Sequence, residues 1–166
     1  MEESLANESV RDIPAVQETE TLASYAGRLF GIPDFDLRTY APLTLAFLGD
    51  AVYELVIRSV VVTKANASPN ELNRKSSTLA KAGTQARIMH EIMGFLTEEE
   101  RAVYKRGRNA HSATRAKNAT VSDYRIATGF EALVGYLYLK GDIRRVLELV
   151  KAGWDGCQAA EGKTGR

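Results

Sequence analysis

The chain has 166 residues, enough for one domain with its own hydrophobic core and too few for two domains of ordinary size. Hydrophobic residues make up 45% of it, which excludes a chain that is disordered throughout. The single cysteine, Cys157, excludes a disulfide framework and a cysteine metal site within one chain. No secretory signal follows Met1, and Glu54 and Arg58 interrupt the longest apolar stretch. We therefore expect a cytoplasmic protein without a membrane span.

Charge is distributed unevenly along the chain. The formal net charge is only +1, but residues 1–20 hold six acidic residues against one arginine, so that the remainder has a net charge of +6. We expect a disordered acidic leader at 1–20, one domain at 21–156 and a flexible tail at 157–166. A basic domain favours nucleic acid as a partner, although only weakly.

From residue 39 onward, start and stop signals indicate a series of helices. Pro42 lies in the first turn of the first predicted helix, where proline is tolerated. Capping boxes begin at Ser68 and Thr97, and Gly141 ends one helix just before Asp142 caps the next. The predicted helices span residues 39–62, 68–83, 97–107, 120–140 and 142–154. Because strand signals are poor, we predict an all-α bundle.

Two carboxylates stand within otherwise apolar helices. Asp50 lies in the segment 47–55, and Glu131 is the only acid in the segment 129–136. A helix that is apolar on nearly all sides is typical of a protein interior, where an unpaired carboxylate is costly. A divalent cation shared by both acids would compensate. Carboxylate oxygens completed by water and phosphate suit Mg²⁺, with Mn²⁺ as a substitute, so we predict that Asp50 and Glu131 bind the metal.

A simpler interpretation stays open, in which each acid pairs with a buried arginine or caps a neighbouring helix. Glu54 has a local explanation, because Arg58 follows it by four residues and would form an ion pair with it. We therefore interpret Glu54 as structural. Gly49 and Gly129 lie close to the two acids in sequence and would let a backbone or a substrate approach closely.

The segment 108–119 is predicted to be a basic loop between two helices. No acidic residue occurs between Arg101 and Ser122. Cations and amides of this kind suit the phosphates of an RNA duplex, which is recognised largely by shape. The candidate RNA-binding residues are Lys105, Arg106, Arg108, Asn109, Arg115 and Lys117. The alternative is a solvated loop that only keeps the protein soluble.

The two acidic segments resemble a known enzyme family. FLGDAVYEL at 47–55 resembles the signature segment of the ribonuclease III catalytic domain, and FEALVGYLYL at 130–139 resembles its second acidic motif. KRGRNA at 105–110 and YRIATGFE at 124–131 resemble the Mini-ribonuclease III branch, which lacks a double-stranded-RNA-binding domain. The resemblance covers residues 40–154.

This resemblance implies a helical, dimeric endoribonuclease in which Asp50 and Glu131 are catalytic. It would hydrolyse double-stranded RNA to leave 5′-phosphates, and the implied substrate is precursor large-subunit (23S) ribosomal RNA. No membrane and no organic cofactor are expected. Two positions depart from the family pattern, because Ala46 replaces a glutamate and Thr128 an aspartate. The number of metal ions per site therefore stays open.

Two other functions are compatible with parts of the sequence. One is a protein of the same fold that binds structured RNA without cutting it, which the presence of both Asp50 and Glu131 disfavours. The other is a helical metal-binding or adaptor protein without an RNA partner, which the acid-free stretch after Arg101 disfavours.

Overall fold

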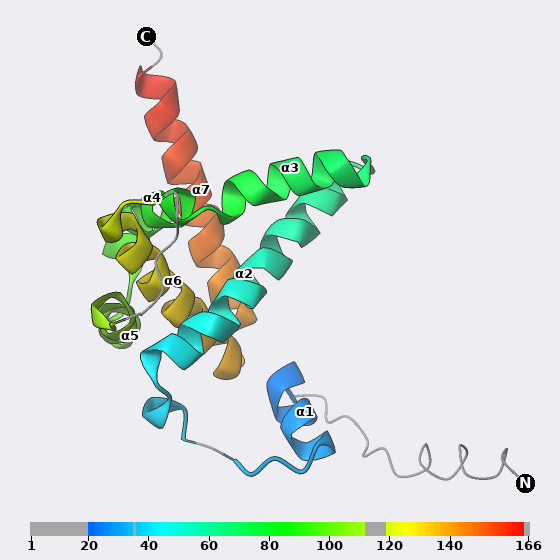
Figure 1. Cartoon of the computed structure of the whole chain (residues 1–166), viewed down its shortest axis with the longest axis vertical. Helices are drawn as coiled ribbons and strands as arrows, with labels where there is room; N and C mark the ends of the chain where they lie inside the picture. Colours follow the sequence, from blue (N-terminus) through cyan, green and yellow to red (C-terminus); the bar gives the residue numbers. More distant parts are fainter. Residues whose placement is uncertain (1–19, 35, 112–118, 165–166) are drawn as a thin grey trace, which may run out of the picture. The chain divides into compact units, whose positions relative to one another are not determined.

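The computed structural model describes residues 20–34, 36–111 and 119–164. Within these ranges all regular secondary structure is helical, which confirms the predicted all-α fold (Figure 1). The chain divides into two compact units, residues 1–36 and 37–166. The predicted acidic leader lies outside the described residues, except for Glu20.

The first unit contains one short helix, α1 (Leu22–Leu29), which the sequence patterns did not delimit. Thr21 begins it with a capping box: the Ser24 amide donates to Thr21 Oγ1 over 3.1 Å, and the Thr21 amide donates to Ser24 Oγ over 3.0 Å. Arg28 in its last turn forms an ion pair with Glu20 at 2.7 Å. No residue of α1 is buried, so local capping rather than a core defines this helix.

The second unit holds the remaining described helices. Their bounds are η1 (Leu37–Thr39), α2 (Pro42–Lys64), α3 (Pro69–Ala80), α4 (Ala82–Ile92), η2 (Met93–Phe95), α5 (Glu98–Asn109), α6 (Val121–Leu139) and α7 (Ile143–Thr164). The predicted caps at Ser68 and Thr97 are present, and Thr120 caps α6 in the same way. Each of these side chains accepts a hydrogen bond from the backbone amide three residues further on.

Several helix boundaries differ from the prediction: α2 runs from Pro42 to Lys64 instead of 39–62, and α4 continues to Ile92, beyond the last residue of the helix expected at 68–83. The expected helix 68–83 ends at Ala80 because Lys81 adopts an extended backbone. α4 begins at Ala82 and runs in a different direction. α5 continues to Asn109, so that part of the expected basic loop is helical. α7 passes Trp154 and runs to Thr164, through residues expected to form a flexible tail.

α6 forms the centre of the second unit. It packs against α2, α4 and α5 and, between Ile126 and Leu137, only Glu131 is not fully buried. Phe130 stands edge-to-face on Tyr53 of α2, with ring centroids 5.1 Å apart. Surrounding helices thus enclose the segment that holds one of the two candidate catalytic acids (Figure 1).

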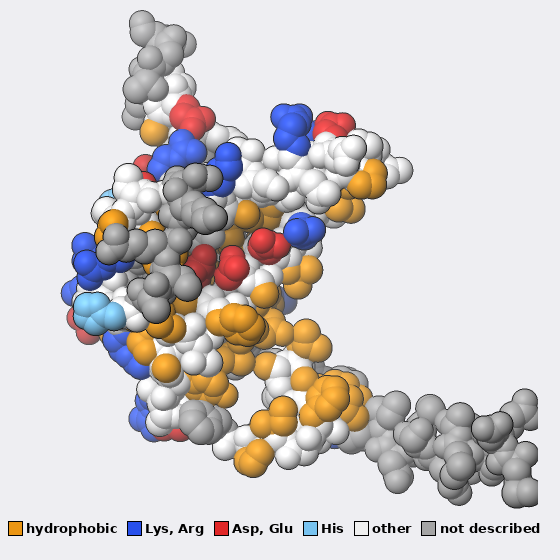
Figure 2. All heavy atoms as spheres, viewed as in Figure 1, with side chains coloured by type: hydrophobic (Ala, Val, Ile, Leu, Met, Phe, Trp, Pro, Cys, Tyr) orange, Lys and Arg blue, Asp and Glu red, His pale blue; other side chains and the backbone are white. Residues whose placement is uncertain are grey.

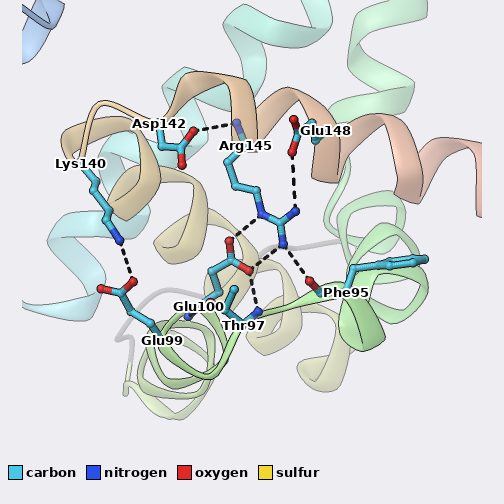
Figure 3. Close-up of polar contacts among 8 residues, drawn as sticks. All are labelled: Phe95, Thr97, Glu99, Glu100, Lys140, Asp142, Arg145 and Glu148. Carbon is cyan, nitrogen blue, oxygen red and sulfur yellow. Dashed lines mark hydrogen bonds and ion pairs between the residues drawn. The ribbon is translucent and has the colours of Figure 1, made fainter. Parts of the chain in front are cut away.

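An ion pair between the buried Glu100 and the partly exposed Arg145 fixes the start of α5 to the start of α7 (Figure 3). Glu100 accepts hydrogen bonds from Arg145 Nε at 2.7 Å and from the Thr97 amide at 2.8 Å, and Arg145 also donates to the Phe95 carbonyl. The Arg145 guanidinium holds the pKa of Glu100 below its ordinary value. Asp142 caps α7 by accepting from the Arg145 amide at 3.1 Å, as predicted.

Within the described part of the chain, no helix combines the length and the apolar character that crossing a membrane requires.

Candidate active site

α2 and α6 cross with their backbones in contact. A methyl group on Gly49 of α2 would overlap the carbonyl of Glu131, and one on Gly135 of α6 would overlap the carbonyl of Leu45. Glycine at both positions is therefore what allows this approach. Because Asp50 follows Gly49 directly, the crossing brings the two candidate catalytic acids together. The close approach of a neighbouring backbone that we expected at Gly49 is confirmed. At Gly129, Tyr104 of α5 fills the space beside the backbone.

Asp50 lies at the surface of α2, not in the interior, so the expectation of full burial is wrong for this residue. The reason is that α2 is covered on one side only, and its other side exposes Phe47 and Leu55. Partial withdrawal from water still raises the pKa of Asp50 above its ordinary value, and the negative charge of Glu54 raises it further.

Glu131 is half-buried on α6 and is the more strongly perturbed acid. Burial raises its pKa from 4.5 to about 7, with a further contribution from the negative charge of Asp50. Burial disfavours the ionised form of Glu131, and the charge of Asp50 disfavours a second negative charge beside it. A site that holds two mutually repelling carboxylates at the surface is suited to bind a cation there.

Gln85 is a residue of this site that the sequence analysis missed. Its side chain is only 2% exposed and donates from Nε2 to the Ala80 carbonyl over 3.1 Å. Its amide lowers the pKa of Glu131 against the stronger effect of burial. A single glutamine in an amphipathic segment gives no signal in the sequence, because only the packing of α4 on α6 brings it to Glu131.

Glu54 and Arg58 form the predicted ion pair at 3.1 Å. The pair is exposed and lies one turn beyond Asp50 on α2. Acidic side chains gather in the middle of the face drawn in Figure 2, with hydrophobic side chains beside them. Glu54 therefore adds negative charge next to Asp50 while its own carboxylate is paired.

The two positions that depart from the family pattern face the core. Ala46 is 5% exposed, and Thr128 is 7% exposed with its hydroxyl donating to the Tyr124 carbonyl at 2.9 Å. Neither contributes a carboxylate to the crossing.

The predicted RNA-binding residues divide into three groups. Lys105, Arg108 and Asn109 are exposed on the last turns of α5, and Arg106 is exposed but donates to the Tyr40 carbonyl at 2.9 Å. Arg115 and Lys117 lie outside the described residues. α5 packs on α6 through Gly107, where an added methyl group would lie 2.6 Å from Ala132 Cβ. The cationic end of α5 is therefore next to the α6 segment that contains Glu131.

The helical fold and the two acidic motifs define a ribonuclease III domain, and the family model described as "Ribonuclease III domain" matches residues 43–142. The chain is 47% identical to a Mini-ribonuclease 3 from Clostridium tetani, over 70% of this chain and 78% of that protein. It is 48% identical to a Mini-ribonuclease 3 from Brevibacillus brevis, over 66% and 82% respectively. A crystal structure of a Fusobacterium nucleatum protein shares 32% identity and superimposes with a TM-score of 0.66, covering 74% of this chain and 98% of that one. The chain therefore belongs to the Mini-ribonuclease 3 branch of the ribonuclease III family and is an endoribonuclease.

Proposed function

We propose that the protein cleaves double-stranded RNA by metal-dependent hydrolysis, with Asp50 and Glu131 as its catalytic and metal-binding residues. The observation that supports this proposal most strongly is the α2–α6 crossing, where two glycines let the helices touch and bring the two carboxylates together. The raised pKa of each acid indicates that the isolated site lacks a compensating positive charge.

The two carboxylates fit a hard divalent cation. Their oxygens are ligands that Mg²⁺ prefers, and Mn²⁺ would be a substitute. Among the described residues, no group of three or more histidine, cysteine, aspartate or glutamate side chains is arranged to hold a metal ion, so water and RNA phosphate would complete the coordination. When bound, the ion would supply activated water and stabilise charge on the phosphate. The role of Asp50 and Glu131 is to hold it at the crossing.

The exposed cations at the end of α5 are proposed to contact RNA phosphates. They flank Gly107, which packs on α6 beside the acid-bearing segment, so a duplex bound by Lys105 and Arg108 would pass close to Glu131. We extend the same role to Arg106, Asn109, Arg115 and Lys117. Arg106 is the weakest of these candidates, because its guanidinium already donates to the Tyr40 carbonyl.

We propose a homodimer whose interface is the exposed apolar side of α2. Phe47 is 84% and Leu55 62% exposed, and Ala51 lies between them at helical spacing. Apolar surface of this kind is typical of an interface. Val56, on the other side of α2, is buried in the core. Sedimentation of wild type and Phe47→Glu tests this: the variant should be a monomer, whereas a monomeric wild type that cuts both strands would contradict the dimer.

For the physiological substrate we propose precursor large-subunit (23S) ribosomal RNA, and for the location of the protein the cytoplasm. Two observations support the substrate. The chain belongs to the Mini-ribonuclease 3 branch, and the resemblance to that branch implied this RNA; in addition, the cationic end of α5 suits duplex phosphates. Cleavage at one position of a transcript that contains the paired ends of this precursor, but not of an unrelated duplex, would support the proposal.

The experiment that tests the proposed activity uses a long RNA duplex with Mg²⁺ or with chelator. Wild type should cut only with Mg²⁺, and Asp50→Asn and Glu131→Gln should bind the duplex but not cut it. A wild type that binds without cutting would support the alternative of a structured-RNA-binding protein. Normal turnover by either variant would show that the assigned site is wrong.

A further inference from the structure

A groove of about 570 Å³ opens between the end of α2, the helices α3 and α4, and the second half of α7. It lies away from the two acids, because Ser76 of α3 shares a small cavity with Glu54, whereas Arg74 on the opposite side of α3 lines the groove. It also lies away from the proposed dimer interface, because Lys64 in its wall follows Leu55 by nine residues, or about two and a half helical turns. A second hollow of about 520 Å³ between α2 and α7 shares four lining residues with the first: Val60, Lys64, Trp154 and Gln158. The two hollows therefore form one elongated depression.

The inner wall of this groove is apolar. Val61 and Ile88 are buried, and Leu79 and Trp154 are half-buried. Trp154 is the only tryptophan in the chain, and it lines both hollows. A groove of this volume with an apolar wall is typical of a site that binds a ligand.

The rim of the groove is cationic. Its charged residues are four cations and one acid, namely Lys64, Arg74, Lys75, Arg87 and Glu161. Arg87 forms an ion pair with Glu161 at 2.8 Å, and Lys75 is paired within its own helix. Lys64 and Arg74 form no ion pair with any residue that the structure describes. The groove thus combines an aromatic and aliphatic wall with two positive charges that lack a counter-charge.

This combination suits a ligand that has flat rings and several negative charges. Proteins that bind single-stranded nucleic acid use such a groove, in which cations follow the phosphates and bases stack on aromatic side chains. The bases of a duplex are stacked on one another, so only an unpaired strand can place a base on Trp154. The elongated shape favours several linked nucleotides over one free nucleotide.

We propose that the groove binds an unpaired RNA strand, with bases on Trp154 and phosphates at Lys64 and Arg74. The strand is the single-stranded flank of a substrate whose duplex part lies at Asp50 and Glu131. For the origin of the strand, this inference rests on the proposed function. α3 stands between the two sites, so the flank would leave the duplex around this helix.

The first test uses the fluorescence of Trp154, which reports directly on the groove because the chain has no other tryptophan. In chelator, an unstructured single-stranded RNA of about the length that one single-strand site covers, roughly eight nucleotides, should quench this fluorescence. A duplex of the same length, and uridine monophosphate at the same nucleotide concentration, should change it little. Absence of quenching by the strand, or equal quenching by the duplex or the mononucleotide, would overturn the inference.

The second test removes the unpaired cations. Arg74→Gln and Lys64→Gln should each weaken strand binding severalfold and flatten the slope of log affinity against log salt by about 0.7. Arg144→Gln is the matched control, because Arg144 is an exposed cation of α7 that does not line the groove, and it should bind like wild type. An equal loss in the control would overturn the inference, as would tighter binding of an oligoglutamate peptide, which would indicate an acidic protein partner.

Cleavage separates this inference from the proposed function. Wild type with Mg²⁺ should cut a duplex that has a single-stranded extension with a lower KM than the blunt duplex. Arg74→Gln should remove this difference and leave kcat unchanged. Equal KM values for the two substrates in wild type would overturn the assignment of the groove to the flank. Failure to cut either substrate would refute the proposed function, whereas the fluorescence result would still decide whether the groove binds a strand.

Discussion

Replacing Glu131 by glutamine should stabilise the metal-free protein in a pH-dependent way. The folded pKa of Glu131 is about 7 and its ordinary value 4.5, because burial and the charge of Asp50 disfavour the ionised form. A raised carboxyl pKa means that wild type loses stability as the pH rises from 4.5 to 7, and that the full penalty is present above pH 7. A shift of this size corresponds to about 3 kcal/mol.

Glutamine carries no charge, so the variant avoids this penalty. With chelator at pH 8, its free energy of unfolding should exceed that of wild type by about 3 kcal/mol, or roughly 9 °C in melting temperature for a domain of this size. At pH 4.5 the two should be equal. The assay is urea unfolding at fixed protein concentration across this pH range.

Added Mg²⁺ should stabilise wild type at pH 8 and leave the variant nearly unchanged, because binding to the folded state alone raises its stability. A stability difference that is the same at pH 4.5 and pH 8 would refute the reasoning, since it would not arise from the charge. Equal stability of both proteins at pH 8 in chelator would show that the ionised Glu131 side chain does not destabilise the folded protein.

Three further predictions follow from packing and charge. Gly49→Ala should lower the free energy of unfolding in urea by about 3 kcal/mol or more, because its methyl group meets backbone, whereas Gly83→Ala, with open space around it, should be neutral or slightly stabilising. Glu100→Gln should cost about 2 kcal/mol or more at pH 7, because it removes the nearer and more buried of the two carboxylates that pair with Arg145; since the pKa of Glu100 is lowered, this difference should shrink as the pH falls below 4.5 and the wild-type carboxyl takes up a proton. Replacing Lys105 and Arg108 by alanine in a cleavage-inactive background should flatten the slope of log affinity against log salt by about one unit per phosphate contact; an unchanged slope would mean that these cations only solvate α5.

Local patterns in the sequence determined the helices that begin with a strong cap. Ser68, Thr97 and Thr120 each satisfy a free amide three residues on, and such a bond depends only on the neighbouring chain. The two acids were equally visible, because a carboxylate in an apolar helix stands out wherever that helix packs. The family resemblance of the segments around them was readable for the same reason.

Only the tertiary structure decided how those acids are exposed and what holds them. The apolar sequence around Asp50 predicted burial, yet exposure depends on which sides of α2 other helices cover, and no helix of the second unit covers the side of Phe47. α4 packs on α6 because Lys81 interrupts a helical pattern and turns the chain there. Periodicity and caps describe a residue and its near neighbours, whereas burial and charge coupling arise between segments that are distant in sequence.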